Sequence, residues 1–189
     1  MSLRVESRFS GGNVAAVRVL EKAPSAEIEF TAHPCGGSES LWFHFRVLES
    51  SPDEPHPGNL TLTLKFLRSL TGCKTPAAMH PVYRGEGQNW NRTKTGVVST
   101  GEDGQAKVSW TIPYPEPASE FALCYPYAFH EVKTLVRKSK AYWSMGAIGL
   151  SSGGRSVQRV SNIIDRAGSR PGIFLVARQH GGETPGSWV

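Results

Sequence analysis

A histidine and a glutamate three residues apart carry the strongest chemical signal in the chain. His180 and Glu183 are separated by two glycines, Gly181 and Gly182. An imidazole nitrogen and a carboxylate oxygen are both good zinc donors, and the glycines let the backbone bend so that both side chains can face one ion. The spacing predicts a metal site at His180 and Glu183. Taken alone, the same H-x-x-E pattern is also typical of a polar surface loop with a capping or solvated histidine.

The segment before this pair gives it a structural setting. Residues 173–177 form the continuous apolar run Ile-Phe-Leu-Val-Ala. Such a run is typical of a strand that is buried on both faces, as in a sheet covered by helices. Functional groups in α/β sheets gather beyond the carboxyl ends of the strands. We therefore expect a buried central strand at 173–177 with His180 and Glu183 just beyond its end.

Three other patterns that could carry chemistry have simpler structural readings. The run Ser-Ser-Gly-Gly-Arg at 151–155 resembles a phosphate-binding loop, but it lacks the Lys-Ser/Thr ending and does not clearly open a helix, so a hairpin turn is favoured. Ser187 has no G-x-S-x-G sequence around it, which excludes a nucleophile elbow. Trp42, Phe43 and Phe45 could line a groove for a carbohydrate or peptide, whereas alternating aromatic residues in a strand are more typical of a core.

The first two thirds of the chain read as short strands separated by turn residues. Residues 41–48 alternate with period two, and so do residues 59–67. A turn at 101–104 separates two further strands. The predicted strands are 13–19, 26–31, 41–48, 59–67, 95–99, 106–112 and 121–125. Short strands at regular spacing predict an antiparallel β-sandwich over residues 1–128.

The pattern changes after this region. No turn residue interrupts residues 129–142, and Val132, Leu135 and Val136 recur at helical spacing. A hairpin is predicted from 147–150 and 156–164 around the turn at 151–155. Together with the strand at 173–177, these elements predict the beginning of an α/β domain over residues 129–189. That domain is incomplete, because one helix and three strands are too few to cover such a sheet.

Composition and charge narrow the function classes. The chain has 189 residues with 20 glycines and 13 prolines, which disfavours a helical bundle. No apolar run approaches the roughly 20 residues of a membrane helix, and the first twenty residues have no apolar stretch of the kind that a secretory signal needs. The formal net charge is +5. Its one basic cluster does not interleave with aromatic residues, so we expect no nucleic-acid partner. Because no apolar run is long enough to span a bilayer, we also expect no membrane partner.

The cysteines indicate a reducing compartment. They are odd in number, far apart and without a C-x-x-C pair, which supports neither a disulfide framework nor a zinc ribbon. We expect all of them to be unpaired thiols in a cytoplasmic protein. These residues are Cys35, Cys73 and Cys124.

Two longer stretches resemble the start of the catalytic domain of zinc metallocarboxypeptidases, most closely the cytosolic-carboxypeptidase-like branch that includes peptide deglutamylases. They are Gly-Leu-Ser-Ser-Gly-Gly-Arg at 149–155 and Ala-Arg-Gln-His-Gly-Gly-Glu-Thr-Pro-Gly-Ser-Trp at 177–188. Four earlier segments resemble the β-sandwich domain that precedes the peptidase domain in that branch. These are Phe-Ser-Gly-Gly-Asn at 9–13, Trp-Phe-His-Phe-Arg-Val at 42–47, Trp-Asn-Arg at 90–92 and Cys-Tyr-Pro-Tyr at 124–127.

The resemblance implies zinc-dependent removal of C-terminal residues from peptides or proteins. It assigns His180 and Glu183 as two zinc ligands, and it expects a later histidine ligand, a general base and the substrate-binding arginines beyond Val189. No catalytic residue is therefore expected within this chain, whose zinc site is a half-site. We expect the chain by itself to be an inactive N-terminal portion of such an enzyme. The alternative function is a non-catalytic β-sandwich module that binds a partner.

Overall fold

The computed structural model describes residues 3–22, 24–34, 41–49, 58–65, 75–114, 118–139, 142–162 and 180–188. The chain divides into two compact units, which are treated separately below. The first contains residues 1–126 together with 178–189, and the second contains residues 127–177. The predicted domain limits, 1–128 and 129–189, remain a prediction.

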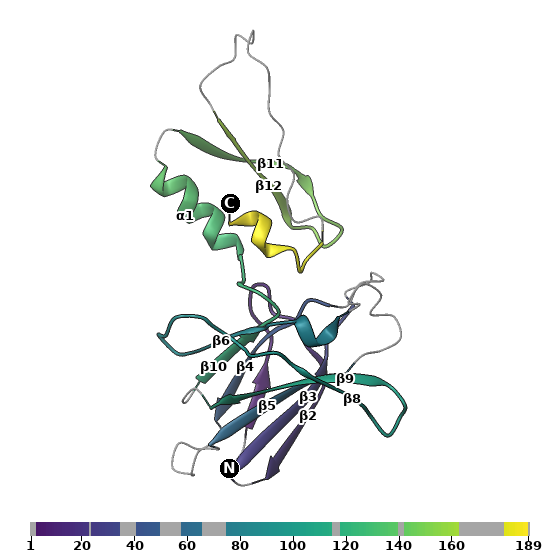
Figure 1. Ribbon diagram of the computed structural model, residues 1–189. Helices are drawn as coiled ribbons and strands as arrows, with labels where there is room; N and C mark the ends of the chain where they lie inside the picture. The colour runs from purple at the N-terminus through teal and green to yellow at the C-terminus, as the bar shows by residue number, and fades with distance from the viewer. Residues whose placement is uncertain are drawn as a thin grey trace. The chain divides into compact units, whose positions relative to one another are not determined.

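The first unit contains two five-stranded sheets (Figure 1). One sheet has the order β1-β4-β10-β6-β7, and every neighbouring pair in it is antiparallel. Its strands are β1 (Leu3–Glu6), β4 (His44–Glu49), β10 (Ala118–Ala122), β6 (Val82–Gly85) and β7 (Asn91–Arg92). This sheet holds most of the polar groups discussed below, because β4, β10 and β6 lie side by side in it.

The other sheet has the order β2-β3-β5-β9-β8. Its strands are β2 (Ala15–Lys22), β3 (Ser25–Thr31), β5 (Asn59–Lys65), β9 (Ala106–Pro113) and β8 (Val97–Thr100). A short 3-10 helix, η1 (Pro76–Ala78), lies between β5 and β6 in the chain. The pair β3–β5 is parallel, while the other neighbouring pairs are antiparallel. The prediction of an antiparallel sandwich is thus confirmed, with the parallel pair β3–β5 as the one exception among the described strands.

The core lies between the two sheets and follows the alternation of the sequence. Phe43 and Phe45 are fully buried, and both pack against Phe30 of β3 in edge-to-face contacts with ring centroids 5.0 and 4.9 Å apart. Edge-to-face pairs at such distances add to the stability that burial provides. The prediction of core positions is confirmed for Phe43 and Phe45, whereas Trp42 is only partly buried and lies outside the core. Arg46, between the buried Phe45 and Val47, points away from the core and is exposed.

The strand predicted at 13–19 begins later, at Ala15. Ala16 has a positive φ of 47°, and the register of β2 against β3 shifts between Ala15 and Arg18. Asn13, just before this irregularity, forms an isolated bridge with His44 of the other sheet. The backbone therefore leaves one sheet and enters the other at this point, which moves the start of the strand from residue 13 to Ala15.

Two other predicted boundaries also shift. The strand predicted at 121–125 is β10 (Ala118–Ala122), so it ends before Cys124. The helix predicted at 129–142 is α1 (Phe129–Lys138) and ends at Ser139, whose hydroxyl donates a hydrogen bond to the Val136 carbonyl at 3.0 Å.

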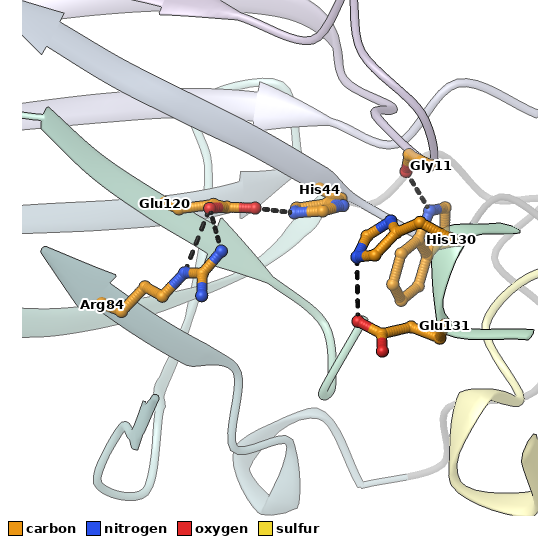
Figure 2. A network of polar contacts seen from close by, with 7 residues as sticks. Gly11, His44, Arg84, Glu120, His130 and Glu131 are labelled. Carbon is orange, nitrogen blue, oxygen red and sulfur yellow. Dashed lines mark hydrogen bonds and ion pairs between the residues drawn. The ribbon is translucent and has the colours of Figure 1, made fainter. Parts of the chain in front are cut away.

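The second unit contains α1 and a hairpin of β11 (Trp143–Leu150) and β12 (Ser156–Asn162). The hairpin prediction is confirmed, since Ser151 and Arg155 close the turn by a backbone hydrogen bond of 2.7 Å and Gly154 has a φ of +72°. On α1, the His130 imidazole lies 3.0 Å from the Glu131 carboxylate (Figure 2). The strand predicted at 173–177 lies outside the described residues. Among the described helices, none has the length and apolar character that a bilayer crossing requires.

Candidate metal half-site and the cluster beside it

His180 and Glu183 lie in one tight loop that leads into the 3-10 helix η2 (Thr184–Ser187). The backbone N–H of Glu183 donates to the carbonyl of His180 at 3.1 Å, which closes the turn over the two glycines. Trp188 ends η2 with a backbone hydrogen bond to Pro185 at 3.1 Å. The local backbone therefore brings the two predicted ligands onto the same side of the loop.

The two side chains are in direct contact. His180 Nδ1 lies 2.7 Å from Glu183 Oε1, and the backbone N–H of His180 donates to Glu183 Oε2 at 3.1 Å. Both side chains remain about half exposed, at 54% and 50%. An imidazole nitrogen and a carboxylate oxygen thus face each other at a place that solvent and ions can reach. This donor set suits zinc, which binds nitrogen and oxygen ligands.

The loop is attached to the sandwich through Cys124. The Cys124 thiol donates to the Gly182 carbonyl at 3.3 Å and also lies 2.9 Å from the hydroxyl of Thr184. Thr184 is fully buried. A second attachment is the Trp188 indole N–H, which donates to the Tyr125 carbonyl at 3.4 Å. The segment just after β10 therefore holds the loop on both sides of Glu183.

An aromatic cluster lies around His44, next to these attachments. Phe9 packs edge-on against the buried His44 ring with centroids 4.8 Å apart, and Trp42 does so at 5.9 Å. The Trp42 indole N–H donates to the Gly11 carbonyl at 2.9 Å, and the Asn13 side-chain amide donates to the Trp42 carbonyl at 2.7 Å. The predicted family segments at 9–13 and 42–47 therefore meet in space.

Glu120 joins His44 to Arg84 across three neighbouring strands (Figure 2). Its Oε1 lies 2.6 Å from His44 Nε2, while its Oε2 accepts from Arg84 Nη2 at 2.7 Å and from Arg84 Nε at 3.1 Å. The Glu120 side chain is 13% exposed. The guanidinium of Arg84 in turn stacks on the Trp90 ring, 4.5 Å from its centroid. The segment 90–92 thereby joins the same cluster.

The charges in this network determine the protonation of Glu120. Burial raises the pKa of the carboxyl, but the hydrogen bonds from His44 and Arg84 and their charges lower it more, and the pKa falls from its ordinary 4.5 to about 2. Glu120 is therefore an anion that only accepts hydrogen bonds. His44 Nε2 must therefore be the donor in this contact. Nδ1 is buried without a hydrogen-bond partner among the described residues.

Sequence reasoning missed this network. His44 had one signal, because a histidine alternates there with core phenylalanines and so lies on the opposite face of the strand. Glu120 and Arg84 had none, since their pairing depends on which strands become neighbours. Cys124 was expected only to be unpaired; it is a free thiol, while Cys35 and Cys73 lie outside the described residues.

No group of three or more histidine, cysteine, aspartate or glutamate side chains that could hold a metal occurs within the described parts of the chain. His180 and Glu183 are brought together as a pair. Their assignment as zinc ligands remains a prediction.

Comparison with known proteins places this geometry in context. No protein-family model matches the chain. It is 26% identical over 215 residues to cytosolic carboxypeptidase 2 of Danio rerio and 26% identical over 212 residues to that of Homo sapiens. It is 24% identical over 206 residues to cytosolic carboxypeptidase 6 of Caenorhabditis elegans. All three alignments cover 100% of this chain, but only 29%, 23% and 43% of the respective relatives.

Solved structures share the fold. A metallo-carboxypeptidase from Burkholderia cenocepacia matches 99% of this chain and 46% of its own with a TM-score of 0.74 at 15% identity. A putative carboxypeptidase A from Shewanella denitrificans matches 83% of this chain and 39% of its own with a TM-score of 0.60 at 21% identity. Together with the curated relatives, these matches confirm that the chain resembles the cytosolic-carboxypeptidase-like branch of the metallocarboxypeptidases.

Proposed function

We propose that this chain is part of a cytoplasmic zinc metallocarboxypeptidase, which removes C-terminal residues from peptides or proteins. His180 and Glu183 would supply two of the zinc ligands. The observation that carries the proposal is the 2.7 Å contact between His180 Nδ1 and Glu183 Oε1 in a half-exposed loop. The relatives named cytosolic carboxypeptidase support the reaction class and the compartment.

The residues present fit zinc as a pair. A catalytic zinc site commonly takes three ligands from the protein and keeps one position open. When bound, the ion would lower the pKa of a water molecule and polarise the scissile carbonyl. The role of this chain is to hold two donors at a fixed spacing, and a third ligand and a general base are required from outside the described residues. The 189-residue chain alone should therefore hold zinc weakly and should not cleave peptides.

Zinc titration of the 189-residue chain tests the assignment. We expect weak binding by calorimetry, with a dissociation constant orders of magnitude above that of a complete site, because a ligand is missing. His180→Ala and Glu183→Gln should each weaken it by about tenfold or more, since each removes half of the remaining donor set. His130→Ala is a matched control, because the exposed His130 and the partly buried Glu131 form another imidazole–carboxylate pair.

Two results would contradict the proposal. Zinc binding that is unchanged in His180→Ala would remove the central assignment. Tight, stoichiometric binding by the chain alone would show that another residue of the chain completes the site. A polypeptide that extends this chain and supplies both the third ligand and the general base should cleave peptides, and that activity should be lost in His180→Ala.

A second candidate function is a non-catalytic sandwich that binds a partner. A groove of about 320 Å³ lies on the outer face of the β4, β10 and β6 strands and favours this reading. Arg46 and Arg84 line it, and Ala118 also contributes to its lining. A peptide that binds there should be insensitive to His180→Ala and should lose affinity in Arg46→Ala, as measured by fluorescence anisotropy.

A further inference from the structure

The thiol of Cys124 contacts both neighbours of the proposed ligand Glu183. Gly182 precedes Glu183, and its carbonyl accepts from Cys124 Sγ at 3.3 Å. Thr184 follows Glu183, and its hydroxyl lies 2.9 Å from the same sulfur. A thiol has one proton to donate. If that proton goes to the Gly182 carbonyl, the Thr184 hydroxyl must donate to the sulfur, so one side chain joins both flanks of Glu183.

The backbone that carries Cys124 is held in place by the sandwich. Cys124 directly follows Leu123, whose backbone N–H donates to the Phe43 carbonyl at 3.0 Å. Phe43 is fully buried in the sandwich core. The sulfur is therefore held by a backbone that is tied to β4, and its position is fixed before any ion binds.

The loop that carries Thr184 is also closely packed against the sandwich. Thr184 is fully buried, so its hydroxyl has no access to solvent and depends on the sulfur for a partner among the described residues. A Cβ at Gly182 would lie 3.5 Å from the Leu123 side chain and 3.9 Å from that of Trp42. The loop thus lies against the sandwich on this side, while the side chains of His180 and Glu183 remain half exposed.

We propose that Cys124 and Thr184 form a clamp that positions His180 and Glu183 for the metal, with the β-sandwich as its rigid base. Cys124 is a positioning residue and not a ligand, because its sulfur contacts the backbone and hydroxyl of the loop rather than the imidazole or carboxylate. This inference rests on the proposed function for its purpose. The clamp contacts themselves are independent of it.

The clamp reduces the entropy that metal binding must overcome. Loop residues that are ordered beforehand lose less conformational freedom when an ion fixes them. Removing the thiol would leave the buried Thr184 hydroxyl without its partner, and an unsatisfied buried polar group is unfavourable. The loop would then open to hydrate that group, and the spacing of the two donors would no longer be fixed.

Two measurements on the 189-residue chain test the clamp. The first needs no metal: amide hydrogen exchange at Glu183 and Trp188 should accelerate about tenfold in Cys124→Ala and in Thr184→Val. The second is a titration with Co²⁺ alone, followed by absorption. The affinity should fall about three- to tenfold in both variants, which corresponds to one net hydrogen bond.

Conservative variants separate positioning from general stability. Cys124→Ser keeps a donor and an acceptor at the same place, so it should restore Co²⁺ affinity to within about twofold of the original chain. Ser187→Ala is the matched control, because it removes a hydroxyl from the same short helix that makes no clamp contact. The urea midpoint should stay near the original value in Ser187→Ala, and Cys124→Ala should lower the free energy of unfolding by no more than about 1 kcal/mol, the net value of one hydrogen bond.

Several outcomes would overturn the clamp. A thiolate-to-cobalt charge-transfer band in the original chain would show that Cys124 is a ligand. Unchanged amide exchange in both Cys124→Ala and Thr184→Val would show that the contacts do not hold the loop. If Co²⁺ binding does not depend on His180 at all, the proposed function fails, and the amide exchange result still decides whether the clamp exists.

Discussion

Replacing Glu120 tests the reasoning about the buried network most directly. The carboxylate accepts from His44 and from two nitrogens of Arg84, and its pKa falls from 4.5 to about 2. A difference of about 2.5 in pKa corresponds to about 3 kcal/mol of stability that the charged form contributes. Glu120→Gln keeps the shape but offers one acceptor oxygen in place of two. We expect it to lower the free energy of unfolding by about 3 kcal/mol near neutral pH, within the range for breaking a buried ion pair.

The sign of the pH dependence follows from the direction of the shift. The pKa of Glu120 is lower in the folded state than in the unfolded state. Its contribution is therefore fully present above the unfolded value of about 4.5, and it is lost as the pH falls toward about 2. The original chain should lose stability in that window more steeply than Glu120→Gln, and the two should converge near its lower end.

Urea unfolding at several pH values, followed by tryptophan fluorescence, measures both effects. Glu86→Gln is the matched control, because Glu86 is an exposed glutamate just after β6, beside the same groove. It should leave the unfolding midpoint near its original value at every pH. Equal slopes for the original chain and Glu120→Gln between about pH 4.5 and 2 would refute the assignment of Glu120 as a charged, buried acceptor.

Three further experiments test the packing of the sandwich and the state of the cysteines. Trp42→Phe removes the indole hydrogen bond to Gly11 and should lower the free energy of unfolding by about 1 kcal/mol, as measured by urea titration. Gly12→Ala should lower the free energy of unfolding by about 2 kcal/mol, because the added Cβ would lie 2.1 Å from the Ser7 carbonyl oxygen. Gly146→Ala is the control and should leave the free energy of unfolding unchanged, because no atom lies within 4 Å of the added Cβ. Alkylation without reductant after unfolding should label every cysteine, and a stable disulfide would contradict the predicted reducing compartment. The cysteines are Cys35, Cys73 and Cys124.

The alternation of apolar residues was enough to predict the sandwich. Residues 59–67 illustrate this, since Leu60, Leu62 and Leu64 are all fully buried in β5. The pattern could not reveal that β5 pairs with β3 in parallel, because period two is the same in parallel and antiparallel strands. It also missed β1 (Leu3–Glu6) and β6 (Val82–Gly85), which are only four residues long. Alternation alone is weak evidence in strands this short; the equally short β8 was predicted because a turn at 101–104 follows it.

The candidate site was predictable only where its residues are close in the sequence. His180 and Glu183 are three residues apart, so local spacing indicated them, and the structure places them in contact. Cys124 lies 60 residues from Thr184, and Glu120 lies 76 residues from His44. Contacts over such separations depend on the order of strands in the sheet, which the sequence pattern does not specify.

The network of His44, Glu120 and Arg84 contributes to the register of the strands that carry it. Burying a carboxylate and a guanidinium is costly, and well-packed apolar residues of similar volume often give equal or greater stability. Stability alone therefore does not explain the network. Its geometry does more: Glu120 requires its partners on β4 and β6 to lie on either side of β10, and a shift of one residue would turn its carboxylate toward the core. Fixing the register of β10 also fixes where the chain leaves the sheet after Ala122, just before Cys124. The ion pair and the clamp are thus consecutive parts of one structural path from the sandwich to His180 and Glu183.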